Sequence, residues 1–164
     1  MDASHCIPVF EFNHLGLTTQ TGRFDKVSGT FSMDRDARVG HVLFNIETAS
    51  LNMGFGTETS NSPGYRLLEV TRFPTMTFKS DKLVFDDKKN VVAAAGQLTL
   101  LGISKPITVS VSRFKCSVHP MFQKMMCAGN ISATVKRSEF GMMSYIPAIS
   151  DEIKVSIPIE AYKD

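Results

Sequence analysis

The sequence of 164 residues contains no tryptophan, and it has no apolar run long enough to cross a bilayer as a helix. It also lacks a run of basic residues, and its formal net charge is only +2. Nucleic-acid-binding proteins carry strongly basic surfaces, so this class is not supported. Residues 1–4 do not form the basic start of a secretory signal. These absences leave a globular protein with a single domain, residues 1–164, as the expectation.

Catalytic motifs are missing as well. Gly54 and Gly56 precede no strand-to-helix motif of the kind that binds phosphate. Asp151 and Glu152 are adjacent, so in a strand their carboxylates point to opposite faces and cannot form an acid–base pair. Cys127 has no histidine at the spacing of a nucleophile and its base. We therefore expect no enzymatic activity.

Only three cysteines are present, and an odd number leaves at least one thiol unpaired. Cys116 and Cys127 flank a stretch that is typical of a connection between two strands. A bridge between them would contribute about 2–3 kcal/mol to the free energy of unfolding and would indicate an oxidising compartment. The alternative is two unpaired thiols in a cytosolic protein. We expect the Cys116–Cys127 disulfide, with Cys6 left free.

The sequence is rich in alternating apolar and polar residues, the pattern of a strand with one buried face. In the stretch GQLTLLGISKPITVSV, Leu98 and Leu100 alternate with polar residues before a turn, and Val109 and Val111 do so after it. The same period predicts eight strands, over residues 8–17, 23–33, 41–51, 75–85, 91–101, 107–116, 127–138 and 151–162.

One segment, residues 56–73, shows no alternation, and here we expect a loop with one or two helical turns after Pro63. An antiparallel sheet of eight strands must protect its edges, so closure into a barrel is the expected architecture. Such a barrel is either filled by its own side chains or hollow enough to hold one ligand. Periodicity does not distinguish the two, so a barrel with a solid core that acts as an interaction module stays an alternative.

The chain resembles the YceI-like family of polyisoprenoid-binding proteins along nearly its whole length. The resemblance depends on an ordered set of short motifs, none of which is decisive alone. The set consists of Ser4-His5, Phe10, His14-Leu15-Gly16, Gly22-Arg23-Phe24, Ser28-Gly29, Asp34, Phe73-Pro74, Phe78, Ser80, Gly96, Leu98-Thr99, Gly102, Lys105-Pro106, Phe140-Gly141-Met142, Asp151-Glu152-Ile153 and Ile159-Glu160-Ala161. One departure is the segment before Phe73, where the family usually carries a charged helix and this chain reads SNSPGYRLLEVTR.

This resemblance implies an all-β fold, an eight-stranded antiparallel lipocalin-like β-barrel with a short helical segment. It also implies the non-covalent binding of a long polyisoprenoid lipid, by a carrier or storage protein. A prenylated quinone such as ubiquinone is the expected ligand, and no catalytic cofactor is expected. Family members are mostly periplasmic or secreted, so we expect this location, together with transient membrane contact and a homodimer.

The inward-facing side chains of such a barrel are the expected ligand contacts. His14 shares a strand face with Phe10 and Phe12, so its imidazole should point inward, where it would bond a quinone carbonyl or a neighbouring protein group. The expected ligand-binding residues are Phe10, Phe12, His14, Phe24, Phe31, Phe44, Ile46, Leu67, Phe78, Leu98, Leu100, Val109, Val111, Phe114, Met126, Phe140 and Met142.

An alternative function concerns residues 119–127, which gather His119, three methionines and Cys127. Thioether, thiol and imidazole are soft ligands that suit copper(I), so a soft-metal or redox protein is the second hypothesis. A single histidine and irregular spacing make a poor copper motif, and we assign no metal ligand. Methionines also adapt their shape readily, which suits a flexible apolar loop over a variable lipid.

Overall fold

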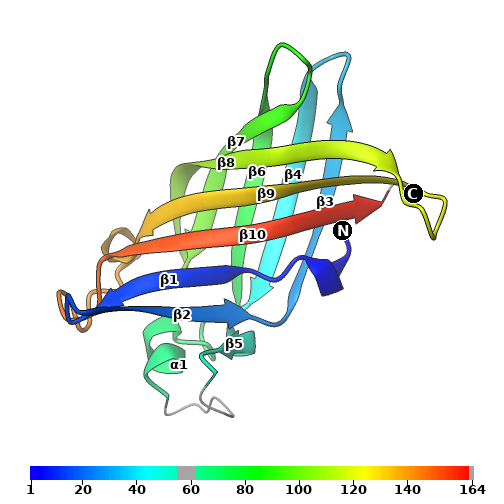
Figure 1. Cartoon of the computed structure of the whole chain (residues 1–164). Helices are drawn as coiled ribbons and strands as arrows, with labels where there is room; N and C mark the ends of the chain where they lie inside the picture. The colour runs from blue at the N-terminus through cyan, green and yellow to red at the C-terminus, as the bar shows by residue number, and fades with distance from the viewer. Residues whose placement is uncertain (55–61, 163–164) are drawn as a thin grey trace.

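The structure is a computed structural model that describes residues 1–54 and 62–162. Within these residues ten antiparallel strands form one sheet (Figure 1). The strands are β1 (Val9–His14), β2 (Thr18–Phe24), β3 (Val27–Asp34), β4 (Val39–Glu47), β5 (Leu51–Asn52), β6 (Thr75–Phe85), β7 (Val91–Leu100), β8 (Ile103–Val118), β9 (Met125–Lys136) and β10 (Glu152–Tyr162). The described residues also form four short helical segments, η1 (Ala3–His5) before the first strand, and η2 (Thr48–Ser50), α1 (Pro63–Leu68) and η3 (Arg137–Phe140) between strands. The all-β antiparallel prediction is confirmed, and the count of eight strands is corrected to ten among the described residues.

The sheet curls on itself into a half-barrel (Figure 1). Its strand order is β3-β4-β6-β7-β8-β9-β10-β1-β2-β5, so β3 and β5 are the two edges. The edges meet at one corner, because β2 continues into β3 and β4 continues through η2 into β5. Two backbone hydrogen bonds of 3.0 Å join this corner, from Asp25 N to Ser50 O and from Glu47 N to Lys26 O. Closure therefore comes from a bonded corner and not from a ladder between β3 and β5.

Two strands account for the difference from the expected count. The strand predicted over residues 23–33 is divided by Asp25 and Lys26, so that Phe24 ends β2 and β3 begins after it. Most of β2 is polar and shows no clear alternation, and its Gly22 lacks a side chain because the Phe10 ring occupies the place of a Cβ. The second strand, β5, is only two residues long, too short for any period to be seen.

The short helix α1 lies in the segment where helical turns were expected, at one end of the half-barrel (Figure 1). Pro63 stands in its first turn, where the missing N–H of proline has no partner to lose. Leu68 is buried in one cluster with Leu51 and Phe24. Residues 56–61 of the predicted loop lie outside the described residues. In the described part of the chain no helix has the length and apolar character needed to cross a membrane.

A β-bulge in β8 changes which residues face the inside of the sheet. The pairing of β8 with β9 shifts between Ser112 and Lys115, and Arg113 within the shift has a positive φ of 54°. Val111 and Phe114 are three positions apart, so a regular strand would place them on opposite faces. Because of the bulge, both pack against the same core cluster. The bulge therefore lets Phe114, beyond the shift, face the same inner side of the sheet as Val111 before it.

A buried arginine fixes the loop of residues 141–150, which leads from η3 to β10. The Arg137 guanidinium is almost fully buried and donates four hydrogen bonds of 2.8–2.9 Å. All four acceptors are backbone carbonyls of the loop, those of Met142, Ser144, Ile149 and Ser150. Burial lowers the pKa of Arg137. These carbonyls replace water around the charge, so the loop and the arginine depend on each other.

A disulfide joins β8 and β9 at the end of β9 that is far from Arg137. Cys116 and Cys127 are directly opposite in the ladder, with Cα atoms 4.0 Å apart, and their bond confirms the predicted pair. Cys6 is free and fully buried, and burial raises the pKa of its thiol. Its Sγ lies 3.6 Å from the carbonyl oxygen of Glu160, which ties the N-terminal segment to β10.

Alkylation followed by intact-mass analysis tests the cysteine assignment. The denatured, non-reduced protein should carry one modified thiol, that of Cys6, because the other two cysteines are bonded. Reduction should raise the number to three, and the native protein should resist modification because Cys6 is buried. Three modified thiols without reduction would contradict the disulfide.

Replacement of the buried arginine tests its role in the 141–150 loop. The change Arg137→Met should lower the free energy of unfolding by about 3 kcal/mol or more, because several carbonyls lose their hydrogen-bond donor. The exposed neighbour Lys136 provides the control, since Lys136→Met should change stability by about 0.5 kcal/mol at most. Urea unfolding measures both, and equal stability of the two variants would refute this role.

Candidate functional site

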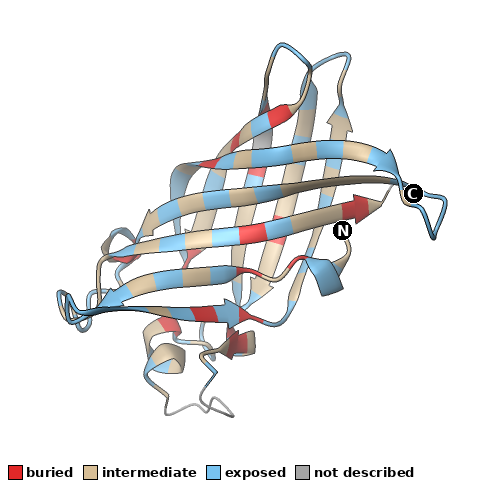
Figure 2. Ribbon diagram, viewed as in Figure 1, coloured by how far each residue is buried: buried red, intermediate tan, exposed pale blue. Residues whose placement is uncertain are grey.

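The inner face of the sheet is apolar, yet much of it is only partly buried (Figure 2). In β9 the inward residues Ala133 and Val135 are intermediate in burial, and so are Ile153 and Val155 in β10. Protein interiors pack as densely as organic crystals, so side chains in a solid core would be almost completely buried. The half-barrel therefore encloses empty space, which argues against the solid-core alternative.

The main cavity has a volume of about 370 Å³ and runs along this inner face. It is lined by side chains from β1, β2, from β4 through β10, and from α1 and the 141–150 loop. A group of aromatic rings stands at the β1–β2 side, with ring centroids 5.5 Å apart for Phe10 and Phe24 and 6.3 Å apart for Phe10 and Phe12. Alternation along strands such as β9 and β10 supplies many of the other apolar side chains.

Polar groups are almost absent from the cavity wall. Among the described residues that line it, only Thr77 and Arg137 carry polar side chains. The Thr77 hydroxyl donates to Asn45 Oδ1 at 3.0 Å, while Arg137 is satisfied by four backbone carbonyls. Within the described part of the chain, no buried side-chain nitrogen or oxygen lacks a hydrogen-bond partner. A ligand would therefore gain affinity by burying hydrocarbon here, and the wall offers few free hydrogen-bonding groups to a polar ligand.

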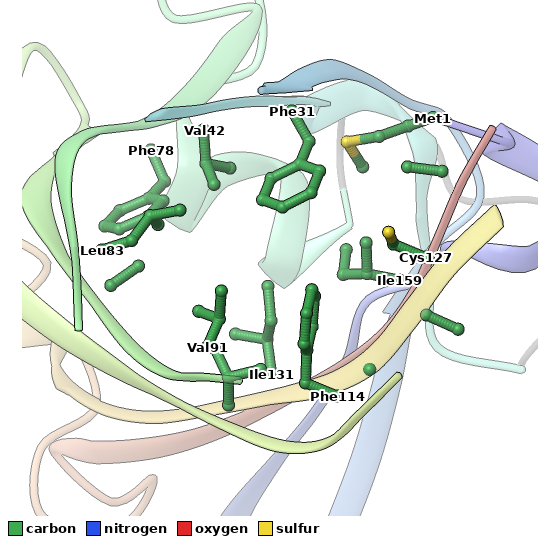
Figure 3. A pocket seen from close by; sticks show the side chains of 15 residues that line it. Met1, Phe31, Val42, Phe78, Leu83, Val91, Phe114, Cys127, Ile131 and Ile159 are labelled. Atoms are coloured by element: carbon green, nitrogen blue, oxygen red, sulfur yellow. The ribbon is translucent and has the colours of Figure 1, made fainter. Parts of the chain in front are cut away.

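A second compartment of about 50 Å³ adjoins the main cavity toward the disulfide (Figure 3). The rings of Phe31 and Phe114 lie on opposite sides of it (Figure 3), in an edge-to-face arrangement with centroids 6.3 Å apart. Val42, Phe78 and Ile131 line both spaces and so form the boundary between them. The wall of this compartment is also apolar, and one of its members is the bonded Cys127.

The structure brings most of the predicted ligand-binding residues to these two spaces. Those that line the main cavity are Phe10, Phe12, Phe24, Phe44, Ile46, Leu67, Phe78, Leu98, Leu100, Val109 and Met142. Those in the small compartment, apart from the shared Phe78, are Phe31, Val111 and Phe114. Their contact with a ligand stays a prediction, but their position around the two adjoining apolar spaces follows from the structure.

Three predicted residues lie elsewhere. His14 is the last residue of β1, where the strand reaches the rim of the sheet, and its side chain is exposed there and does not line the cavity. Met126 is next to the inward-facing Cys127 in β9, and neighbouring residues of a strand point to opposite faces. Phe140 is buried in the core cluster of Phe24 and so supports the cavity wall from behind.

Sequence reasoning missed much of the wall contributed by the last two strands. Ile131 and Ala133 in β9, and Ile153 and Val155 in β10, follow a clear period of two that already indicated their inward direction. No alternation in the sequence indicated that Arg137 would reach the cavity wall. Its burial depends on backbone carbonyls of the 141–150 loop, and the apolar–polar pattern does not predict the path of that loop.

The 119–127 loop offers poor ligands for a soft metal. The Cys127 sulfur is bonded to Cys116. The Nδ1 atom of His119 lies 3.2 Å from the backbone nitrogens of Met121 and Phe122, which donate hydrogen bonds to it. One thiol and one imidazole nitrogen are therefore already engaged, which weakens the soft-metal hypothesis.

Elsewhere in the described residues, one group of side chains has the spacing of a metal site. Asp2, His5 and Glu160 meet where η1 contacts β10, with His5 Nδ1 3.1 Å from Asp2 Oδ2 and 3.5 Å from Glu160 Oε2. A hydrogen bond to Asp2 and the charge of Glu160 raise the pKa of His5. A protonated imidazole between two carboxylates accounts for the arrangement as an exposed ion pair that secures the N-terminal segment.

Several of the known sequences that are similar to this chain come from bacteria. A family model described as YceI-like domain matches residues 1–161. A UPF0312 protein of Pseudomonas aeruginosa is 26% identical over 165 residues, which covers 99% of this chain and 84% of that protein. A UPF0312 protein of Vibrio cholerae is 32% identical over 108 residues, which covers 65% of this chain and 57% of that protein. The chain therefore spans little more than half the length of the Vibrio relative.

Solved structures show the same fold. The crystal structure of Burkholderia cenocepacia BcnA matches with a TM-score of 0.74 and 18% identity, over 98% of each chain. A polyisoprenoid-binding domain from Saccharophagus degradans, implicated in plant cell wall breakdown, matches with a TM-score of 0.67 and 17% identity, over 99% of this chain and 95% of that one. With the family model matching 161 of the 164 residues, the chain belongs to the YceI-like family.

Proposed function

We propose that this protein binds a long isoprenoid lipid non-covalently and acts as its carrier or store. The observation that carries this proposal is the hollow, almost wholly apolar interior of the half-barrel. The similar fold of a domain described as polyisoprenoid-binding supports it. Binding, and not catalysis, is what the geometry suits, because the described residues of the cavity wall include no nucleophile and no acid–base pair.

Burial of hydrocarbon supplies the affinity. Each buried isoprenoid unit contributes about 3–4 kcal/mol, at about 0.8 kcal/mol per carbon. Association itself costs about 4–15 kcal/mol, so a few buried units suffice for tight binding without any polar contact. A flexible tail would fill the main cavity and extend past Val42, Phe78 and Ile131 toward the small compartment.

A prenylated quinone, such as ubiquinone, is the ligand we favour. Since the hydrogen-bonding groups of the cavity wall are already partnered, a polar head is better placed at the rim than inside. His14 is exposed at that rim and stays our candidate donor to a quinone carbonyl. The tail, which provides most of the affinity, would then determine binding, and the head would contribute selectivity.

A periplasmic or secreted location follows naturally from this proposal. The Cys116–Cys127 disulfide supports it, because structural disulfides persist mainly in oxidising compartments. A carrier in such a compartment would meet membrane surfaces, where isoprenoid lipids are dissolved. We also propose that the protein forms a homodimer.

Lipid extraction tests the proposed function directly. Organic extraction of the purified protein, followed by mass spectrometry, should recover an isoprenoid lipid in near-stoichiometric amount, with a prenylated quinone as the expected species. Delipidated protein should take up added ubiquinone. Failure of both measurements, with the protein still folded, would reject lipid binding, while recovery of another isoprenoid would reject only the quinone.

A charge placed in the cavity wall tests the inward assignment. Phe12→Asp and Phe44→Asp should each abolish lipid loading, because an unpaired carboxylate in apolar surroundings costs several kcal/mol. Phe12 is the more informative of the two, since it is only partly buried while Phe44 also supports the core. Circular dichroism should accompany each measurement of bound lipid.

The matched control is Ser110→Asp. Ser110 is exposed on the outer face of β8, next to the cavity-lining Val109, and its substitution should leave loading unchanged. Loss of lipid from folded Ser110→Asp, or normal loading of both phenylalanine variants, would show that the inner and outer faces are assigned the wrong way round.

A further inference from the structure

Two loops at one end of the half-barrel expose large apolar side chains. Leu15 and Leu17 belong to the β1–β2 loop, and Met143 and Tyr145 belong to the 141–150 loop. All four are between 53% and 82% exposed, with Leu17 the most exposed. We refer to these four side chains as the rim cluster. A hydrogen bond from Leu15 N to Ala148 O joins the two loops, which lie side by side in Figure 1.

The rim cluster is continuous with the main cavity. Met142 and Ile149 belong to the same loop as Met143 and Tyr145, and both line the cavity wall. Ile149 also forms an isolated bridge with His14 at the end of β1. Apolar surface therefore extends from the cavity wall onto the outside of the molecule at this end.

The backbone of both loops is held in a conformation that large side chains rarely adopt. Leu15 has a φ of 58° and Tyr145 a φ of 67°, both in the left-handed region. Gly16 follows at 70°, where glycine is the natural choice. Asparagine or aspartate would suit such turns and would also favour water. Large apolar residues are less favourable than these at such positions, so the turns themselves do not account for the choice of leucine and tyrosine.

We propose that the rim cluster docks the protein on the surface of a lipid bilayer. Residues 15–17 and 141–149 include no aspartate, glutamate, lysine or arginine, so these loops bring no charge into the apolar region of a membrane. Leucine and methionine side chains would enter the acyl boundary, while the phenol of Tyr145 suits the headgroup level. This docking depends on apolar insertion and not on attraction to anionic lipids.

The inference rests on the proposed function, since a carrier of an isoprenoid must reach the bilayer in which that lipid is dissolved. Docking at the rim would bring the apolar wall of the cavity to the membrane surface, so that a tail could pass between them without crossing water. The two ideas are separable, because docking is measured with vesicles that contain no isoprenoid.

A second exposed apolar site provides the matched control. The β8–β9 hairpin, at the other end of β9 and β10, exposes Val118 and Met121. Its Phe122 is 60% exposed as well, although one side of the ring contacts His119 and Tyr162, with centroids 4.6 Å and 6.1 Å away. This hairpin does not contribute to the main cavity, so docking there would bring no cavity wall to the membrane.

Vesicle binding of two double variants tests the proposal. The rim variant is Leu17→Ser with Met143→Ser, which avoids both positions of positive φ, and the control is Val118→Ser with Met121→Ser. Neutral phosphatidylcholine vesicles without isoprenoid serve as the probe. The rim variant should bind these vesicles about tenfold more weakly than the unmodified protein, because two buried apolar side chains are lost. The control variant should bind as the unmodified protein does, and added salt should have little effect on any of them.

Several outcomes would overturn the docking surface. These are absence of vesicle binding by the unmodified protein, unchanged binding by the rim variant, a stronger loss in the control variant, or a steep decrease with salt. A rim variant that changes from dimer to monomer would instead assign the rim to contact between copies of the chain, and would also refute the proposal. Lipid extraction from each variant shows separately whether the cavity still holds its ligand, so failure of docking and failure of lipid binding are distinguishable.

Discussion

The structure depends on an apolar concave surface that the protein does not fill with its own side chains. Curling of one antiparallel sheet brings the inward faces of nine strands around a cavity of about 370 Å³. Such a surface is unfavourable in water, and a hydrophobic ligand relieves that cost by replacing the water. The shape of the cavity must therefore be maintained by contacts in its wall and not by a packed centre.

Those contacts lie at the boundaries of the sheet. The corner of β2 and β3 with β4 and β5 joins the two edges through backbone hydrogen bonds. At one end of β9 and β10, Arg137 holds the 141–150 loop through four carbonyls, and at the other end of β9 a disulfide connects it to β8. A frame fixed at its ends leaves the interior free for a ligand of variable shape, which is what a flexible isoprenoid tail requires.

The sequence predicted the features that depend on local pattern. Alternation identified the antiparallel strands and the inward direction of residues such as Phe12 and Phe44, and the position of the cysteines in two neighbouring strands predicted their bond. It did not predict β2, because this strand is mostly polar and does not alternate. Gly22 of β2 makes room for the Phe10 ring, and a glycine required by such close packing adds nothing to an apolar–polar pattern. His14 was placed on the correct strand face, but only the three-dimensional extent of the sheet shows that this face ends at the rim. Arg137 likewise depends on a loop whose path follows from tertiary contacts.

The central claim is that the interior is hollow and is completed by a hydrocarbon tail. Thermal unfolding of the delipidated protein with increasing amounts of an isoprenoid alcohol tests it most directly, because a ligand that binds only the folded state stabilises that state and raises the midpoint with the logarithm of the free ligand concentration. The account predicts a rise in the midpoint that begins near one equivalent of alcohol and that Phe12→Asp removes. An unchanged midpoint at saturating alcohol, with the delipidated protein as stable as the protein first purified, would contradict it.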